Sequence, residues 1–165
     1  MTGSPPDHST SAKMVADIYT ISITLDVNAQ RALFLMLSAD GSINRQGSGT
    51  FRDMAHDLFI GITDPAIFYS VRSHLTDDML QAGEQSGLLG HTFQFHNQRG
   101  APCKLEIRFF CKDGASAGSF AFLYGAESEG PPRFLTNLVR MAVHETEPWY
   151  QQFRTGVESA EKHRP

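Results

Sequence analysis

The amino-acid sequence predicts a single α+β domain, with an antiparallel sheet of about five strands joined by hairpins and two to four helices packed on one face. Two observations predict this class. Segments with strand-like alternation come in hairpin pairs, and segments with helical spacing follow groups of strands rather than single strands. The composition is globular, since 41% of the 165 residues are hydrophobic and 19% are charged.

The domain is expected to span residues 15–157. Residues 1–14 are rich in Ser, Thr and Pro and hold too little apolar material to fold, so we expect a disordered N-terminal tail. Residues 158–165 are similarly polar and are expected to be a frayed C-terminal tail.

The first sheet region is expected to begin with a strand over residues 18–25. Its odd-numbered positions are apolar from 19 onward and its even-numbered positions from 20 carry hydroxyl groups, which indicates a sheet with one face exposed to water. Residues 32–37 are all apolar, so the segment 32–38 predicts an interior strand.

A tight hairpin with two positive-φ residues is predicted at Asp40-Gly41. The returning strand is expected over residues 42–50. It carries Gly47 and Gly49, which indicate a bulge, a sheet edge or the close approach of another backbone.

Two helix starts follow. Asp64 is an acidic N-cap directly before Pro65, which is favoured at a first helical position. Thr76 is a hydroxyl cap before two carboxylates, and the helix dipole favours them there. We expect Gly83 and Gly87 to end this second helix early.

A second hairpin is expected to join a strand over residues 103–111 to one over residues 119–124. Cys103 and Cys111 both lie on the apolar side of the first of these strands. Their separation of roughly 26 Å, at about 3.3 Å per residue, is far beyond the limit of about 7 Å for a disulfide. The two thiols are therefore expected to be free and buried.

The last helix is expected to follow Pro131 and Pro132 and to stop at Pro148, because a proline inside a helix costs about 3 kcal/mol. A short separate turn would then hold Trp149 and Tyr150.

Charge and hydropathy restrict the partners. Eighteen acidic and fourteen basic residues give a net charge of −4, and no stripe of Lys or Arg is present to neutralise phosphates, so we expect no nucleic acid. The longest apolar run, residues 32–37, is too short to span a membrane, and the N-terminus lacks a secretory pattern. The expected location is the cytoplasm.

Motifs of catalysis are incomplete. Residues 114–118 read G-x-S-x-G, but a strand is expected after the serine where a nucleophile elbow needs a helix. His144-Glu145 lacks the second histidine of a zinc-protease helix because Pro148 occupies its place. We therefore assign no catalytic or metal-binding residue and expect no cofactor.

Four residues are candidates for ligand or partner binding. Arg45 lies on a hairpin arm and is able to bind a carboxylate. Tyr124, Trp149 and Tyr150 flank the last helix, and large amphipathic aromatics in such loops are typical of binding hot spots. The same rings would equally fit at a core edge.

The sequence favours a non-enzymatic protein-binding module, such as an adaptor or an immunity-like protein. The alternative is a small enzyme or ligand binder whose polar groups meet only in three dimensions. A third possibility is a homodimer paired through the edge of the 42–50 strand, which is compatible with the protein-binding module. The polar residues of the alternative would be Arg45, Asp53, His56 and Asp57; the last three share a helical spacing that fits a weak metal or acid–base site as well as a solvated turn.

Overall fold

Residues 14–49 and 57–162 are described in the computed structural model of the chain, with side chains described as far as Arg154. Within these residues, seven strands form one sheet in the order β4-β3-β2-β1-β6-β7-β5. Neighbouring strands are antiparallel except β5 and β7, which are parallel. The α+β class is confirmed, while the expected five antiparallel strands are corrected to seven strands in a mixed sheet.

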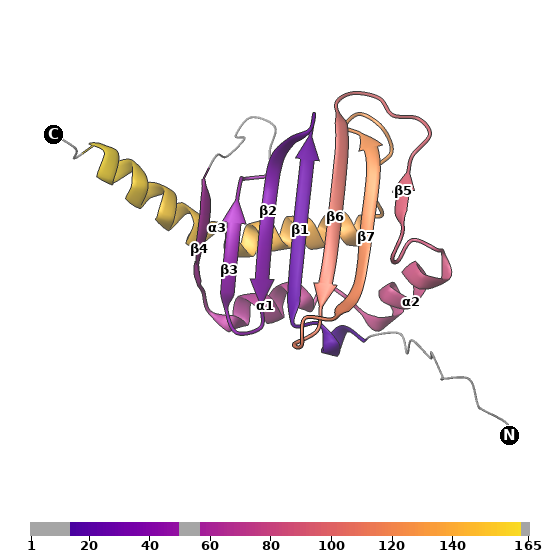
Figure 1. Cartoon of the computed structure of the whole chain (residues 1–165), viewed down its shortest axis with the longest axis horizontal. Helices are drawn as coiled ribbons and strands as arrows, with labels where there is room; N and C mark the ends of the chain where they lie inside the picture. Colours follow the sequence, from indigo (N-terminus) through magenta and orange to yellow (C-terminus); the bar gives the residue numbers. More distant parts are fainter. Residues whose placement is uncertain (1–13, 50–56, 163–165) are drawn as a thin grey trace, which may run out of the picture.

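The helices lie on one side and at one end of this sheet. α3 (Arg133–Lys162) crosses one face from the β7 side and continues beyond β4, α1 (Pro65–Arg72) packs beside it, and α2 (Asp77–Gln85) lies at the β5 end (Figure 1). A 3₁₀ turn, η1 (Val15–Asp17), precedes the first strand. The strands are β1 (Thr20–Val27), β2 (Gln30–Ser38), β3 (Ser42–Gln46), β4 (Leu58–Ile62), β5 (Thr92–Gln94), β6 (Pro102–Phe110) and β7 (Ser116–Gly125).

The core lies between the sheet and the helices α1 and α3. Alternate residues of β1, β2 and β6 point into it, as the period of two requires, and Phe68 and Leu138 close it from the helices. The opposite face of the sheet carries no described helix (Figure 1). Its central strands hold a shallow hollow of about 320 Å³ in which Arg31 pairs with Asp26 at 2.7 Å.

Local capping signals are confirmed. Asp64 accepts a hydrogen bond from the Ala66 amide at the start of α1, and Thr76 accepts one from the Met79 amide at the start of α2. Gly83 does not end α2 as expected. It lies inside the helix, where an added Cβ would be 2.9 Å from the Phe120 ring, so the glycine allows the helix to approach the sheet.

The positive-φ hairpin lies elsewhere than predicted. Between β2 and β3 only Gly41 has a positive φ, of 91°, whereas Asn28 and Ala29 between β1 and β2 have φ of 51° and 59°. Two consecutive positive φ values define the tight two-residue hairpin that suits the twist of the strands. The residue types at Asn28-Ala29 do not indicate this conformation, because Ala is rare at a positive φ.

The helix α3 passes through Pro148, so the predicted stop there is wrong. A proline inside a helix costs about 3 kcal/mol. Immediately after it, however, Trp149 and Tyr150 are buried against the sheet. Each large apolar side chain buried contributes roughly 1.5–3 kcal/mol, so their packing offsets the lost hydrogen bond.

The strand β3 is not a sheet edge, which corrects the expectation for residues 42–50. It ends at Gln46 and is covered by β4, with Arg45 opposite Phe59. Gly47 then meets the backbone of β2, where a Cβ would lie 2.2 Å from the Ala32 carbonyl oxygen. The predicted close approach of another backbone is therefore confirmed.

Candidate functional site

Arg45 is the largest fully buried side chain of the described residues, with an exposure of 0%. It reaches from β3 across to α3 and uses its planar fork of donors on several acceptors at once. These are the Gly47 carbonyl (3.2 Å), the Val143 carbonyl (3.2 Å), Thr146 Oγ1 (3.0 Å) and Glu147 Oε2 (2.5 Å). We call these residues, with Tyr150, the Arg45 cluster.

Tyr150 completes this cluster. The Arg45 guanidinium lies 4.3 Å from the centre of its ring, and the hydroxyl accepts a hydrogen bond from the Gly47 amide at 3.2 Å. A guanidinium over an aromatic face is attracted by the ring quadrupole, more so when both are desolvated. The cluster therefore fixes α3 against the β3 end of the sheet.

In the Arg45 cluster, Arg45 and Glu147 each stabilise the charged form of the other. Burial lowers the pKa of Arg45, and the hydrogen bond and the charge of Glu147 act against that change. Partial burial alone would raise the pKa of Glu147, but hydrogen bonds from Gln151 and Arg45 and the charge of Arg45 outweigh it, so the pKa lies below its ordinary value. The carboxylate that Arg45 was expected to bind is thus one of this chain's own.

Aromatic packing beside the cluster positions β4. The Phe59 ring makes an edge contact with Tyr150 and lies 5.7 Å from Phe153. At Gly61 an added Cβ would be 2.9 Å from the Trp149 ring. The inward side of β4 is therefore fixed on α3 by one aromatic ring and one close backbone contact.

The structure brings three of the four candidate residues together. Arg45, Trp149 and Tyr150 meet under β3 and β4, although they come from distant parts of the sequence. All three are buried, so a partner would contact their surroundings rather than these side chains. Tyr124 lies on β7, which three strands separate from β3, and burial, with a smaller effect from Cys103, raises its pKa to about 12.

Of the proposed polar trio, Asp57 is exposed at the start of β4. Asp53 and His56 lie outside the described residues. Arg45 is buried and directed into its own cluster, whereas Asp57 is exposed.

The outward side of β4 is apolar and exposed. Leu58, Ile60 and Ile62 are 47%, 68% and 78% exposed, and Phe153 beside the strand is 39% exposed. These four residues were not predicted as a site from the sequence. A signal was present, because the run Leu58–Ile62 is apolar and β-prone between Asp57 and the cap at Asp64.

Along the edge of β4 that faces away from β3, no described strand pairs with the backbone. The Thr63 amide donates to the Gly41 carbonyl at 2.8 Å, so odd-numbered residues pair with β3 and even-numbered ones point away, by the alternation of an antiparallel ladder. Among the described strands, β4 has β3 as its sole neighbour. The backbone N–H and C=O groups of Leu58, Ile60 and Ile62, with their side chains, form what we call the β4 edge.

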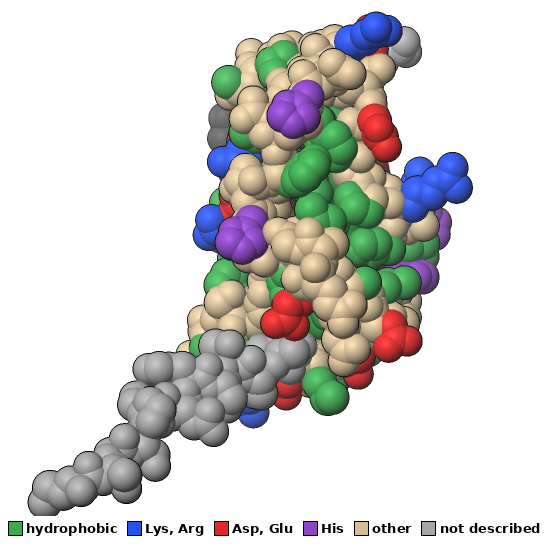
Figure 2. All heavy atoms as spheres, turned by 90° about the vertical axis from the view of Figure 1, so that its right-hand side faces the viewer, with side chains coloured by type: hydrophobic (Ala, Val, Ile, Leu, Met, Phe, Trp, Pro, Cys, Tyr) green, Lys and Arg blue, Asp and Glu red, His purple; other side chains and the backbone are tan. Residues whose placement is uncertain are grey.

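The opposite edge of the sheet is different. β5 has three residues, and its Phe93 makes an edge contact with Phe95, with ring centres 4.8 Å apart. Figure 2 views this side and shows a band of apolar side chains broken by polar and charged ones. So short a strand offers few backbone groups to a neighbour, which is one way in which proteins protect a sheet edge.

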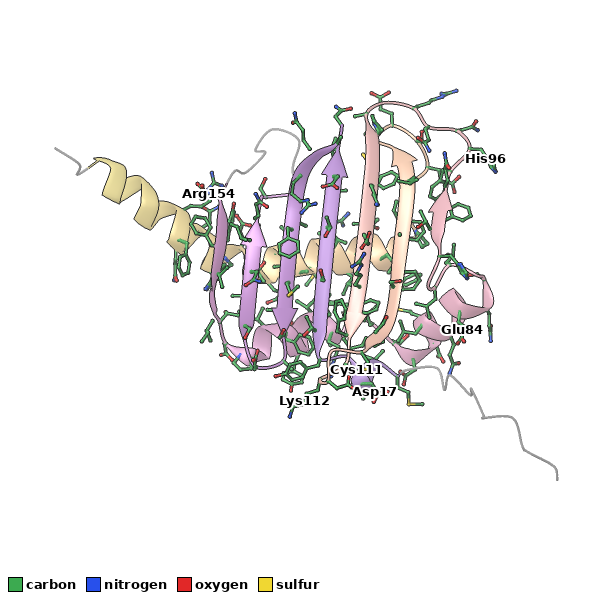
Figure 3. The ribbon with its side chains drawn as sticks, in the orientation of Figure 1. Asp17, Glu84, His96, Cys111, Lys112 and Arg154 are labelled. Atoms are coloured by element: carbon green, nitrogen blue, oxygen red, sulfur yellow. The ribbon has the colours of Figure 1, made fainter. Side chains whose placement is uncertain are left out.

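Two further features are a hollow at the lower end of the sheet and the G-x-S-x-G motif. Asp17, Cys111 and Lys112 gather at the lower end of the sheet beside a hollow of about 490 Å³ (Figure 3), where Arg72 is engaged by the Ile18 carbonyl at 3.1 Å. Ser116 starts β7, so the expected strand after the G-x-S-x-G serine is confirmed. No group of metal-ligating side chains occurs among the described residues.

The described helices include none that is long and apolar enough to cross a membrane. Comparison of the chain with protein-family models, curated proteins and solved structures finds no match.

Proposed function

We propose that this chain is a non-enzymatic protein-binding module, of an adaptor or immunity-like kind, whose docking site is the β4 edge. One observation carries the proposal: a five-residue apolar strand ends the described sheet with exposed side chains, and no other described strand pairs with its outward backbone groups. Natural proteins protect such edges with lysines, prolines, bulges or short strands. The strand β4 contains no lysine and no proline, and its five residues are not short for a strand. An edge left in this state is suited to a neighbour.

The construction behind β4 supports a preformed site. The Arg45 cluster and the rings of Trp149 and Phe59 hold β3, β4 and α3 together, so the edge is presented on a rigid frame. A rigid edge lowers the ordering cost of binding. The net charge of −4 supports a protein partner over nucleic acid, and the two free cysteines support a cytoplasmic setting.

Selection from a random peptide display library on the immobilised chain tests this function. The proposal expects enriched peptides whose binding is lost with Ile60→Lys and retained with Phe93→Lys, which places the same charge on the opposite edge. Both side chains are exposed, so both variants are expected to fold. Peptides that bind the Ile60→Lys variant as well as the wild type would place the docking site elsewhere.

A further inference from the structure

We infer that the occupant of the β4 edge is an extended segment of a partner protein, with basic flanks, which pairs antiparallel to β4 as an eighth strand of the sheet. The inference rests on the proposed function and names the conformation and chemistry of the partner. Three features of the described residues carry it: the direction of the free backbone groups, the surfaces on the two sides of the added strand, and the charges at its ends.

The backbone groups favour strand addition over other modes of docking. Leu58, Ile60 and Ile62 each direct one N–H and one C=O away from β3, at the two-residue spacing of a ladder. A helix seated on the same edge would leave these groups facing an apolar surface without partners, which is costly. An extended segment pairs with all of them.

The side chains of β4 determine which surface each face of the added segment would contact. Residues opposite Leu58, Ile60 and Ile62 would lie beside their exposed side chains on the open face of the sheet. The residue opposite Gly61 would point toward α3, where the Trp149 ring already covers Gly61 and the Phe153 ring lies beside it. An aromatic side chain there would pack against the exposed Phe153 ring.

The helix α3 would lie against the face of the added strand that points away from the open face of the sheet. It continues past β4 as far as Lys162, so it extends over the place where an eighth strand would lie (Figure 1). The exposed ring of Phe153 is part of this overhanging segment and gives the added strand an apolar surface to cover.

The charges at the two ends of β4 favour a partner protein with basic flanks over a second copy of this chain. Asp57 and Asp64 lie just beyond the two ends of β4 and are exposed. If two copies paired antiparallel about Ile60, Asp57 of each would face Thr63 of the other and lie beside its Asp64, so carboxylates would gather at both ends. Like charges in such positions are unfavourable, whereas Lys or Arg flanks on a partner segment are favoured.

The probe for this inference is the synthetic peptide KKVFVTVKK, labelled with fluorescein and titrated with the whole chain by anisotropy. Its three valines would pair with Ile62, Ile60 and Leu58, and its Phe would lie opposite Gly61. N-methylation of the central Val removes an N–H that points at Ile60, whereas N-methylation of Thr alters an N–H that points away.

The inference expects central N-methylation to weaken binding about tenfold or more, while the Thr-methylated control stays within about twofold of the parent peptide. Replacing the four Lys by Glu is also expected to weaken binding about tenfold at low salt. Equal binding of the two methylated peptides would overturn strand addition, and equal binding of the Lys and Glu peptides would overturn the charge argument.

Sedimentation tests whether a second copy of this chain, and not a partner protein, occupies the β4 edge. The inference expects the chain to stay monomeric at the concentrations of the titration, whereas dimerisation abolished by Ile60→Lys would assign the edge to a second copy and overturn it. The proposed function would survive a failure of the methylation test if displayed peptides still bound in an Ile60-dependent way.

Discussion

Replacing Arg45 by Ala is predicted to destabilise the fold far more than removing the charge of its ion-pair partner. The substitution empties a fully buried volume and leaves the Gly47 and Val143 carbonyls without the guanidinium. A buried acceptor left without a partner costs about 1–3 kcal/mol, and the cavity beside Tyr150 adds to it. The expected loss is about 3–5 kcal/mol, a large part of a typical domain stability of about 5–15 kcal/mol.

Glu147→Gln separates the effect of the ion pair from the effect of the buried contacts of Arg45. The Glu147 side chain is 37% exposed, and an amide oxygen at this position can still accept a hydrogen bond from Arg45, so only the charge of the pair is lost. We expect a loss of about 1 kcal/mol or less. Arg31→Ala is the matched control, because Arg31 forms an exposed ion pair with Asp26 and its removal should also cost about 1 kcal/mol or less.

Urea unfolding followed by circular dichroism measures all three variants. The expected order of the free energy lost is Arg45→Ala first, with Glu147→Gln and Arg31→Ala both small. The reasoning would be refuted if Arg45→Ala unfolded within about 1 kcal/mol of the wild type, the range of a surface pair. It would also be refuted if Glu147→Gln cost as much as Arg45→Ala, because the ion pair and not the backbone contacts would then dominate.

Three further predictions concern single positions. Ala29→Gly is expected to raise the free energy of unfolding by about 1 kcal/mol, because Ala29 has a φ of 59° that glycine adopts without strain; an unchanged urea midpoint would contradict this. Gly47→Ala is expected to cost at least about 2 kcal/mol, since its Cβ would lie 2.2 Å from the Ala32 carbonyl oxygen, and a thermal melt equal to that of the wild type would argue against the contact. The lowered pKa of Glu147 means that its contribution to stability is present above about pH 4.5 and is lost as the pH falls through the folded-state pKa. The stability difference between wild type and Glu147→Gln should therefore shrink in acid unfolding below pH 4.5, and a difference that grew there would have the wrong sign.

The parts of the fold predicted from sequence are those fixed by neighbouring residues. The caps at Asp64 and Thr76 were predicted because a cap needs only the side chain and the amides two or three residues later. The core face of β1 followed from its alternation. In each case the deciding contact or pattern lies within a few residues of the sequence.

The parts that were wrong depend on distant residues. Pro148 is tolerated because Trp149 and Tyr150 gain burial against strands about a hundred residues earlier in the chain, and no local pattern reports that gain. Arg45 was predicted on a hairpin arm as a candidate for binding a carboxylate, and it is enclosed because β4 and α3 both cover β3. The strand β4 was missed because a five-residue apolar run without alternation does not by itself indicate a strand.

Amide hydrogen exchange of the unliganded chain, resolved residue by residue by NMR, tests the central claim that β4 is an open edge. The account predicts slow exchange at Phe59 and Gly61, whose N–H groups face β3, and fast exchange at Ile60 and Ile62, whose N–H groups face outward. Slow exchange along the whole of β4 would contradict the account, because it would mean that another part of the chain already pairs with this edge.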